Sequence, residues 1–154
     1  MKFPSVKATS LAKKEYLVPD ELEGEYNLVL VAFKQWHQDL VDTWIPSLQS
    51  LAFRHPQLRV YEMPTMSRLN GLYRALIDNG MRAGIPDQRV RASTLCAYID
   101  IESFVRASDL PNTETIYLFL VDRAGEVDWQ GSGQFDPKQL AELNRVLDLR
   151  LATA

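Results

Sequence analysis

Residues 28–33 form one continuous apolar run, and this run constrains the fold more than any other feature of the chain. Its sequence, Leu-Val-Leu-Val-Ala-Phe, does not alternate with polar residues, which predicts a strand buried on both faces. The apolar residues that follow recur at the three-and-four spacing of one helical face: Leu40, Val41, Trp44, Ile45, Leu48 and Leu51. Pro46 lies inside this pattern, so we expect the helix to be kinked there rather than to end.

Strand and helix patterns continue to alternate along the rest of the chain. Strands are predicted at residues 58–63, with Pro64 as the stop, at 93–99, at 116–121 and at 127–130 after a tight turn at 122–125. Helices are predicted at 69–81, at 101–106 and from Pro137 onward, with a polar connection at 85–91. This order predicts an α/β sandwich whose central mixed sheet has about five strands flanked by helices. The 154 residues suit a single domain, with residues 1–24 as an N-terminal arm that contains a short strand.

Charge and composition exclude several classes of function. A net charge of −3 is not the basic excess that nucleic-acid-binding proteins usually show. One cysteine and two histidines cannot form an internal disulfide and are a poor supply for a zinc site, so we expect no metal and no cofactor. No segment approaches the ~20 consecutive apolar residues of a membrane-spanning helix. We therefore expect a cytoplasmic protein that reaches a membrane only through a partner.

Residues 26–51 are similar to the active-site arm of thioredoxins, in which a strand leads through a tryptophan into a helix that contains a proline. Redox thioredoxins carry two catalytic thiols at the start of this helix. Counting from Trp36 places the pair at His37 and Leu40, and counting back from Pro46 places it at Gln38 and Val41. Under either register the arm lacks both thiols.

Four further motifs make the resemblance more specific. They are Tyr61-Glu62-Met63-Pro64, the Gly-Met-Arg-Ala-Gly-Ile-Pro-Asp stretch at 80–87, Ala97-Tyr98-Ile99-Asp100, and the strand, turn and Trp-x-x-x-Gly exit of residues 116–133. In these motifs the chain resembles the thioredoxin-like family that assists mitochondrial ATP synthase assembly, together with its bacterial relatives. The resemblance implies a thioredoxin-like three-layer sandwich. It also implies a protein that binds and guides a partner protein, such as a subunit of a membrane complex, without redox turnover.

Four residues at the start of the predicted arm helix are candidates for function. Trp36 and His37 lie where the carboxyl end of a strand meets a helix, the usual place of a ligand crevice in an open α/β sheet. They either contact a partner or pack and cap the helix. Asp39 and Asp42 lie about one helical turn apart, where acids usually serve the helix dipole rather than acid–base catalysis.

Two further candidates for partner binding lie later in the chain. Arg82, Arg89 and Arg91 form a basic cluster that either is a solvated face or grips a carboxylate or phosphate. Trp129, on the predicted edge strand, is either a partner anchor or a core residue.

Two functions remain open, and they differ in the role that they give to Cys96. Its place in an apolar strand is typical of a structural cysteine, which behaves as a small hydrophobic residue. The first function is a non-redox thioredoxin-like protein that binds or helps assemble a partner. The alternative is a divergent thiol-dependent oxidoreductase or peroxidase that uses Cys96 alone with an external thiol.

Overall fold

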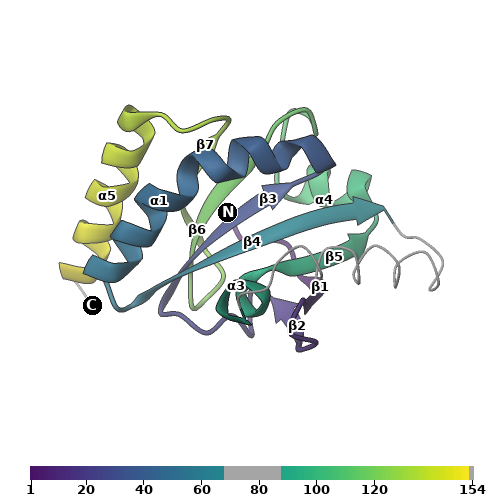
Figure 1. Ribbon diagram of the computed structural model, residues 1–154, viewed down its shortest axis with the longest axis horizontal. Coiled ribbons are helices and arrows are strands. Elements are labelled where there is room, and N and C mark those ends of the chain that lie inside the picture. Colours follow the sequence, from purple (N-terminus) through teal and green to yellow (C-terminus); the bar gives the residue numbers. More distant parts are fainter. Residues whose placement is uncertain (68–87, 153–154) are drawn as a thin grey trace.

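A seven-stranded mixed sheet forms the centre of the computed structural model, which describes residues 1–67 and 88–152 (Figure 1). The strands lie in the order β2-β1-β5-β4-β3-β6-β7. Their bounds are β1 Val6–Ser10, β2 Glu15–Val18, β3 Tyr26–Ala32, β4 Leu58–Ser67, β5 Leu95–Ile99, β6 Tyr117–Asp122 and β7 Val127–Ser132. The helices are the 3-10 helix η1 Gln35–His37, α1 Gln38–Arg54, α3 Gln88–Ser93, α4 Ile101–Ala107 and α5 Pro137–Ala152.

The sheet is larger than the sheet of about five strands that the sequence predicts. As expected, β3, β4 and β5 are parallel to one another, and β6 runs antiparallel to β3 and carries β7. The extra strands β1 and β2 come from the predicted N-terminal arm, and their hairpin joins the sheet beside β5. The inner face of β1 consists only of Val6, Ala8 and Ser10. Its apolar signal in the sequence is therefore weak.

Two predicted boundaries are wrong. β4 continues through Pro64 to Ser67 instead of ending at the proline. Pro64 is the last residue of β4 paired with β3, and pairing with β5 takes over at Thr65, so the missing N–H falls where the strand changes neighbours. Residues 88–93 are helical, so the polar connection predicted to reach residue 91 ends earlier. The helix predicted at 69–81 lies outside the described residues.

Other predicted elements are confirmed. α1 continues through Pro46, α4 covers the predicted short helix, and α5 starts with Pro137. The hairpin turn between β6 and β7 is stabilised by the Asp122 carboxylate, whose Oδ1 accepts hydrogen bonds from the backbone N–H groups of Ala124 and Glu126, both at 2.9 Å. Gly125 in this turn has φ +84°, a backbone region that favours glycine.

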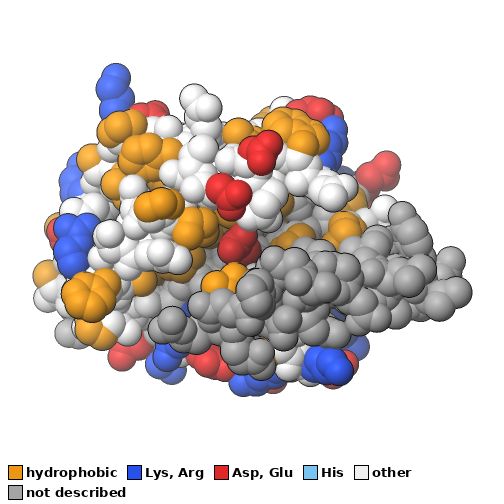
Figure 2. Space-filling model, in the orientation of Figure 1, with side chains coloured by type: hydrophobic (Ala, Val, Ile, Leu, Met, Phe, Trp, Pro, Cys, Tyr) orange, Lys and Arg blue, Asp and Glu red, His pale blue; other side chains and the backbone are white. Residues whose placement is uncertain are grey.

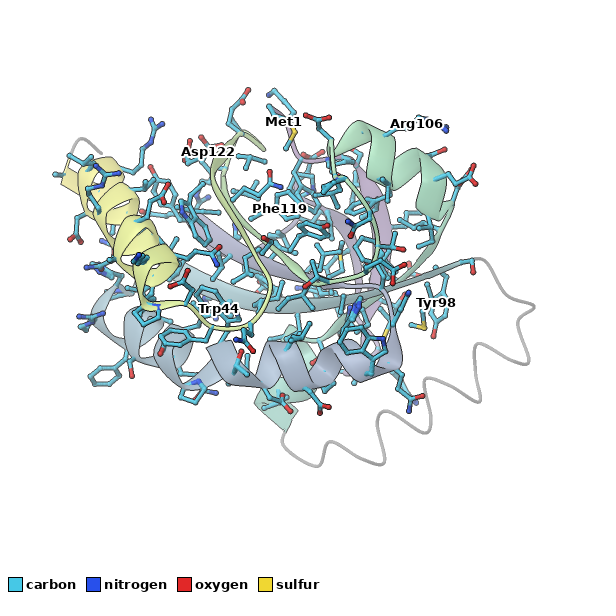
Figure 3. The ribbon with its side chains drawn as sticks, turned by 90° about the horizontal axis from the view of Figure 1, so that it is seen from above. Met1, Trp44, Tyr98, Arg106, Phe119 and Asp122 are labelled. Atoms are coloured by element: carbon cyan, nitrogen blue, oxygen red, sulfur yellow. The ribbon has the colours of Figure 1, made fainter. Side chains whose placement is uncertain are left out.

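Two apolar cores lie on opposite faces of the sheet. One core joins α1 and α5 to the sheet through residues such as Trp44, Leu48 and Leu143, all fully buried. The other lies beneath α4 and the N-terminal residues and contains Phe3, Phe104 and residues of the sheet. Figure 3 shows the same arrangement from above, with α4 across the sheet from α1 and α5. The three layers are therefore helices, sheet, and α4 with the N-terminal segment.

The carboxyl ends of β3 and β4 lie at the same end of the sheet. Their arrowheads point to the end of the sheet where α1 begins and where α4 lies (Figure 1). η1 and α1 follow β3 after a link of only two residues, Phe33 and Lys34. The fold therefore presents the start of the thioredoxin-like arm beside α4.

Candidate functional site

His37 replaces the first thiol of the arm under one register, and the structure buries it completely. Its Nδ1 accepts hydrogen bonds from the backbone N–H groups of Phe33 at 3.0 Å and Lys34 at 3.2 Å. A ring nitrogen that accepts hydrogen bonds carries no proton, so Nε2 carries the proton of the neutral ring. Nε2 is buried, and the ring also interacts with the backbone of Glu114. His37 therefore holds the turn between β3 and α1.

The surroundings of His37 keep its ring neutral. Burial lowers its pKa below the ordinary value of 6.5, and the charge of Lys34 adds to that effect. The backbone and the charge of Glu114 act in the opposite direction, but burial has the largest effect. His37 is thus a neutral structural ring near pH 7 rather than a proton shuttle.

Trp36 lies next to His37 and is 54% exposed. Its ring meets the His37 ring edge-on, with 4.5 Å between centroids and 77° between planes. The other two tryptophans, Trp44 and Trp129, are 0% and 5% exposed. Trp36 is therefore the one tryptophan that offers an aromatic face to a partner.

An ion pair joins the Trp36 segment to the loop that precedes β6. The Lys34 Nζ lies 2.7 Å from Glu114 Oε2, and this contact lowers the pKa of the Glu114 carboxyl. Asn112 shapes the same loop, because its Oδ1 accepts hydrogen bonds from the Glu114 N–H at 2.9 Å and the Tyr117 hydroxyl at 3.0 Å. The sequence could not reveal this contact, because its partners are separated by 80 positions.

A groove of about 480 Å³ lies between α4 and this loop. We call it the α4 groove; its lining consists of Ile101, Glu102, Val105, Arg106, Asn112, Thr113 and Glu114. Ile101 and Val105 supply an apolar floor, and the charged residues stand at its rim. Glu114 belongs to both the groove and the ion pair with Lys34. Trp36, Lys34, Glu114 and the α4 groove therefore form one continuous surface, the Trp36 surface.

A partly buried carboxyl group that sequence reasoning missed lies on the other side of α1. Gln38 Nε2 donates hydrogen bonds to Asp42 Oδ1 at 2.9 Å and to Glu62 Oε1 at 3.2 Å. Burial raises the pKa of Glu62, and Asp42 adds to the shift. The available signal was an acid inside the apolar strand at 58–63. The exposed Asp39 lies outside this hydrogen-bonded group.

Cys96 lies in β5, away from the arm. It is 2% exposed and packs with Leu11 and Tyr98 in a small apolar cluster that Met66 also contacts. β4 separates β5 from β3, the strand that leads into the arm. The structure therefore places the thiol in the interior and in a different part of the sheet from Trp36.

The remaining sequence candidates do not join the Trp36 surface in the described residues. Trp129 packs against α5 in the core, so it is not an accessible partner anchor, although β7 is an edge strand as predicted. Arg89 and Arg91 belong to α3. Arg82 lies outside the described residues, and the grouping of the three arginines stays a prediction.

A second surface hollow, of about 390 Å³, lies at the opposite end of β3. It is lined by residues such as Tyr26, Asp122 and Arg123. Nearby, the buried carboxylate of Asp128 contacts Arg150 at 3.3 Å. Within residues 1–67 and 88–152, acidic, histidine and cysteine side chains form no group that could hold a metal ion. The helices described for those same residues are too short or too polar to cross a membrane.

Solved structures of thioredoxin-like proteins match nearly the whole chain, whereas no curated protein matches it. The exposed lipoprotein thioredoxin of Streptococcus pneumoniae is 11% identical, with a TM-score of 0.58, over 92% of this chain and 98% of that one. A protein assigned as thiol:disulfide interchange protein DsbE of Chlorobium tepidum is 16% identical, with a TM-score of 0.56, over 95% of this chain and 92% of that one. A protein assigned to electron transfer in Aquifex aeolicus is 7% identical, with a TM-score of 0.61, over 94% of both chains. These similarities show that the fold is thioredoxin-like.

A family comparison is more specific than the fold. The model of the family described as ATP10 protein matches residues 1–149. The matched range includes the arm, the α4 groove and all seven strands. The chain belongs to the ATP10 protein family.

Proposed function

We propose that this chain is a non-redox thioredoxin-like protein that binds a partner protein through the Trp36 surface and assists the assembly of ATP synthase. One observation carries the proposal: a fully buried histidine occupies the position of the first thiol under one register of the arm, and an exposed tryptophan lies beside it. The arm has the order of elements of a thioredoxin arm and carries no thiol under either register. What remains there is a surface for contact.

The location of the single cysteine supports a role without redox turnover. Neither pair of arm positions, His37 with Leu40 or Gln38 with Val41, contains cysteine. Cys96 is buried in β5. A reactive thiol needs exposure and a nearby positive charge that stabilises the thiolate. The proposed function therefore requires no cofactor and no external reductant.

The composition of the Trp36 surface suits protein contact. Tryptophan is enriched among the residues that dominate binding energy, especially where a surrounding rim excludes water. The α4 groove adds an apolar floor, and rim charges such as those of Lys34 and Glu114 act chiefly on the association rate. Membership of the ATP10 protein family supports a subunit of ATP synthase as the partner. The proposal places the chain in the cytoplasm, at the membrane only through that partner.

Co-purification of ATP synthase subunits with tagged variants tests the proposed function. Trp36→Ala should reduce the recovered subunits at least about tenfold, because a central aromatic anchor is lost. Phe53→Ala is the matched control, since Phe53 is 89% exposed but lies in the last turn of α1, far along the helix from Trp36. Equal recovery with both variants, or no subunits with the wild type, would contradict the proposal.

A further inference from the structure

The charges around Trp36 are unbalanced among the described residues. The acids of this end are Asp39, Asp42, Glu62, Asp100, Glu102 and Glu114, and the cations are Lys34 and Arg106. Lys34 is already paired with Glu114. Arg106 donates to Ser103 Oγ at 3.4 Å and makes no ion pair with a described residue. The described acids of this end therefore outnumber its cations, and negative charge remains.

Asp39 and Glu102 carry the uncompensated charge closest to the two parts of the surface. Both are exposed, and neither makes an ion pair with a described residue. Asp39 follows Trp36 by three positions in the continuous helical stretch of η1 and α1, so the two residues share one face. Glu102 stands at the rim of the α4 groove. An acid thus accompanies both the aromatic anchor and the apolar floor.

We propose that the partner segment bound at the Trp36 surface is basic and apolar, with a lysine or arginine held by Trp36 and Asp39 and an apolar side chain in the α4 groove. This inference rests on the proposed function, because it names the chemistry of the segment that this surface binds. A cation over the face of an exposed tryptophan is attracted by the ring, and a nearby carboxylate adds to that attraction. Ile101 and Val105 give the apolar side chain a floor to cover.

Charge complementarity favours this occupant over an acidic segment. An acidic segment would meet Asp39 and Glu102, and Arg106 is the one cation that the described part of the surface offers against them, because Lys34 is paired with Glu114. Like charges at an interface raise the cost of the wrong partner, and opposite charges speed the encounter with the right one. We therefore expect the bound segment to carry positive charge.

Binding of short synthetic peptides to the full chain tests the inference. The probe is a fluorescein-labelled peptide of alternating lysine and leucine, compared with versions in which glutamine or glutamate replaces lysine. The lysine peptide should bind at least about tenfold more tightly than the glutamine peptide, the glutamate peptide should bind more weakly still, and added salt should reduce these differences. Binding should also shift the tryptophan emission, and this shift should disappear in Trp36→Phe.

Charge-reversal variants locate the effect. The double variant Asp39→Lys, Glu102→Lys should lose the preference for lysine and bind the glutamate peptide better than the wild type does. Glu25→Lys is the control, because Glu25 is an exposed acid just before β3, at the opposite end of that strand. Equal binding of the lysine and glutamate peptides, or an equal effect of Glu25→Lys and the double variant, would overturn the inference. If Trp36→Ala abolishes recovery of ATP synthase subunits while the lysine peptide does not bind, the inference fails and the proposed function stands.

Discussion

At the scale of single residues, His37 explains how the arm keeps its shape without thiols. Its ring supplies an acceptor for the N–H groups of Phe33 and Lys34, which the sharp turn between strand and helix leaves without a carbonyl partner. A buried N–H without an acceptor costs about 1–3 kcal/mol. The histidine is therefore a structural residue at a position that, under one register of the arm, holds the first thiol in redox thioredoxins.

Two substitutions of His37 distinguish the contribution of its packing to stability from that of its hydrogen bonds. His37→Ala should lower the free energy of unfolding by about 2–4 kcal/mol, because it leaves a cavity and two N–H groups without an acceptor. His37→Asn should recover part of this loss, since the asparagine carbonyl lies near the place of Nδ1. Urea unfolding monitored by circular dichroism measures both variants. Equal stability of the alanine and asparagine variants would show that the ring acts only by filling space.

The lowered pKa of His37 also predicts a dependence on pH. Above about pH 6.5 the ring is neutral in the folded and unfolded chain, so it adds no dependence. Below that pH the unfolded chain binds a proton that the folded chain takes up only at lower pH, so the free energy of unfolding falls. The wild type should therefore lose more stability than His37→Asn between about pH 7 and pH 5.5. Parallel curves for the two proteins in urea unfolding would contradict the burial of a neutral ring.

Gly131 is a second residue whose identity has a physical reason. A Cβ at this position would overlap the indole of Trp129, which is buried in the core, and would also crowd Gln139 Oε1. Gly131→Ala should lower the free energy of unfolding by about 1–3 kcal/mol through overpacking. A double-mutant cycle with Trp129→Leu measures the coupling, and the cost of the alanine should shrink in that background. The control is Gly133→Ala, where φ is +77° but no clash exists, so about 1–2 kcal/mol of backbone strain is expected in both backgrounds.

At the scale of elements, the β7 edge is closed to strand addition at its end. The side-chain amide of Gln139, in the first turn of α5, accepts a hydrogen bond from the Ser132 N–H and donates one to the Ser132 carbonyl, both at 2.9 Å. An unpaired edge strand is a template for another chain, and a side chain that occupies its backbone groups blocks that pairing. This end of β7 is therefore not open to strand addition.

Removing the Gln139 amide tests that role. Gln139→Ala should lower the free energy of unfolding by about 1 kcal/mol for the two lost hydrogen bonds. It should also increase concentration-dependent self-association, measured by sedimentation velocity. Gln139→Glu keeps an acceptor for the Ser132 N–H but places a carboxylate oxygen against the Ser132 carbonyl in place of the lost donor. Its effect on stability should therefore be similar to that of Gln139→Ala or larger. An alanine variant that matches the wild type in stability and remains monomeric would show that Gln139 does not protect the β7 edge.

How well each element could be predicted depends on how local its cause is. β3, α1, the hairpin and α5 follow from continuous apolar runs, helical spacing and turn residues within a few positions. The sequence predicts one short strand in residues 1–24 rather than the β1–β2 hairpin, because the few apolar residues of the hairpin gain a buried face only by pairing with β5. β4 passes Pro64 because its neighbour changes there, which depends on chain segments far away in the sequence.

At the scale of the whole molecule, the sheet brings the residues of the proposed Trp36 surface together from distant segments. Trp36 and its arm were visible in the sequence, although its exposure was not. The Lys34–Glu114 ion pair and the α4 groove required the fold, because they join the end of β3 to α4 and the loop before β6. The space-filling view shows apolar side chains along the face that carries α1 and α5 as well (Figure 2). Apolar exposure alone therefore does not mark the site; the aromatic anchor, groove and acids together do.

The burial of Cys96 within the sheet makes the non-redox claim directly testable on the whole protein. The decisive measurement is turnover of insulin disulfides with dithiothreitol, and of hydrogen peroxide in the same samples, by the wild type and by Cys96→Ala. Both proteins should match the protein-free blank, because the arm has no thiol and Cys96 is 2% exposed. Turnover by the wild type that disappears in Cys96→Ala would show that the chain is a thiol-dependent enzyme and would contradict the proposed function.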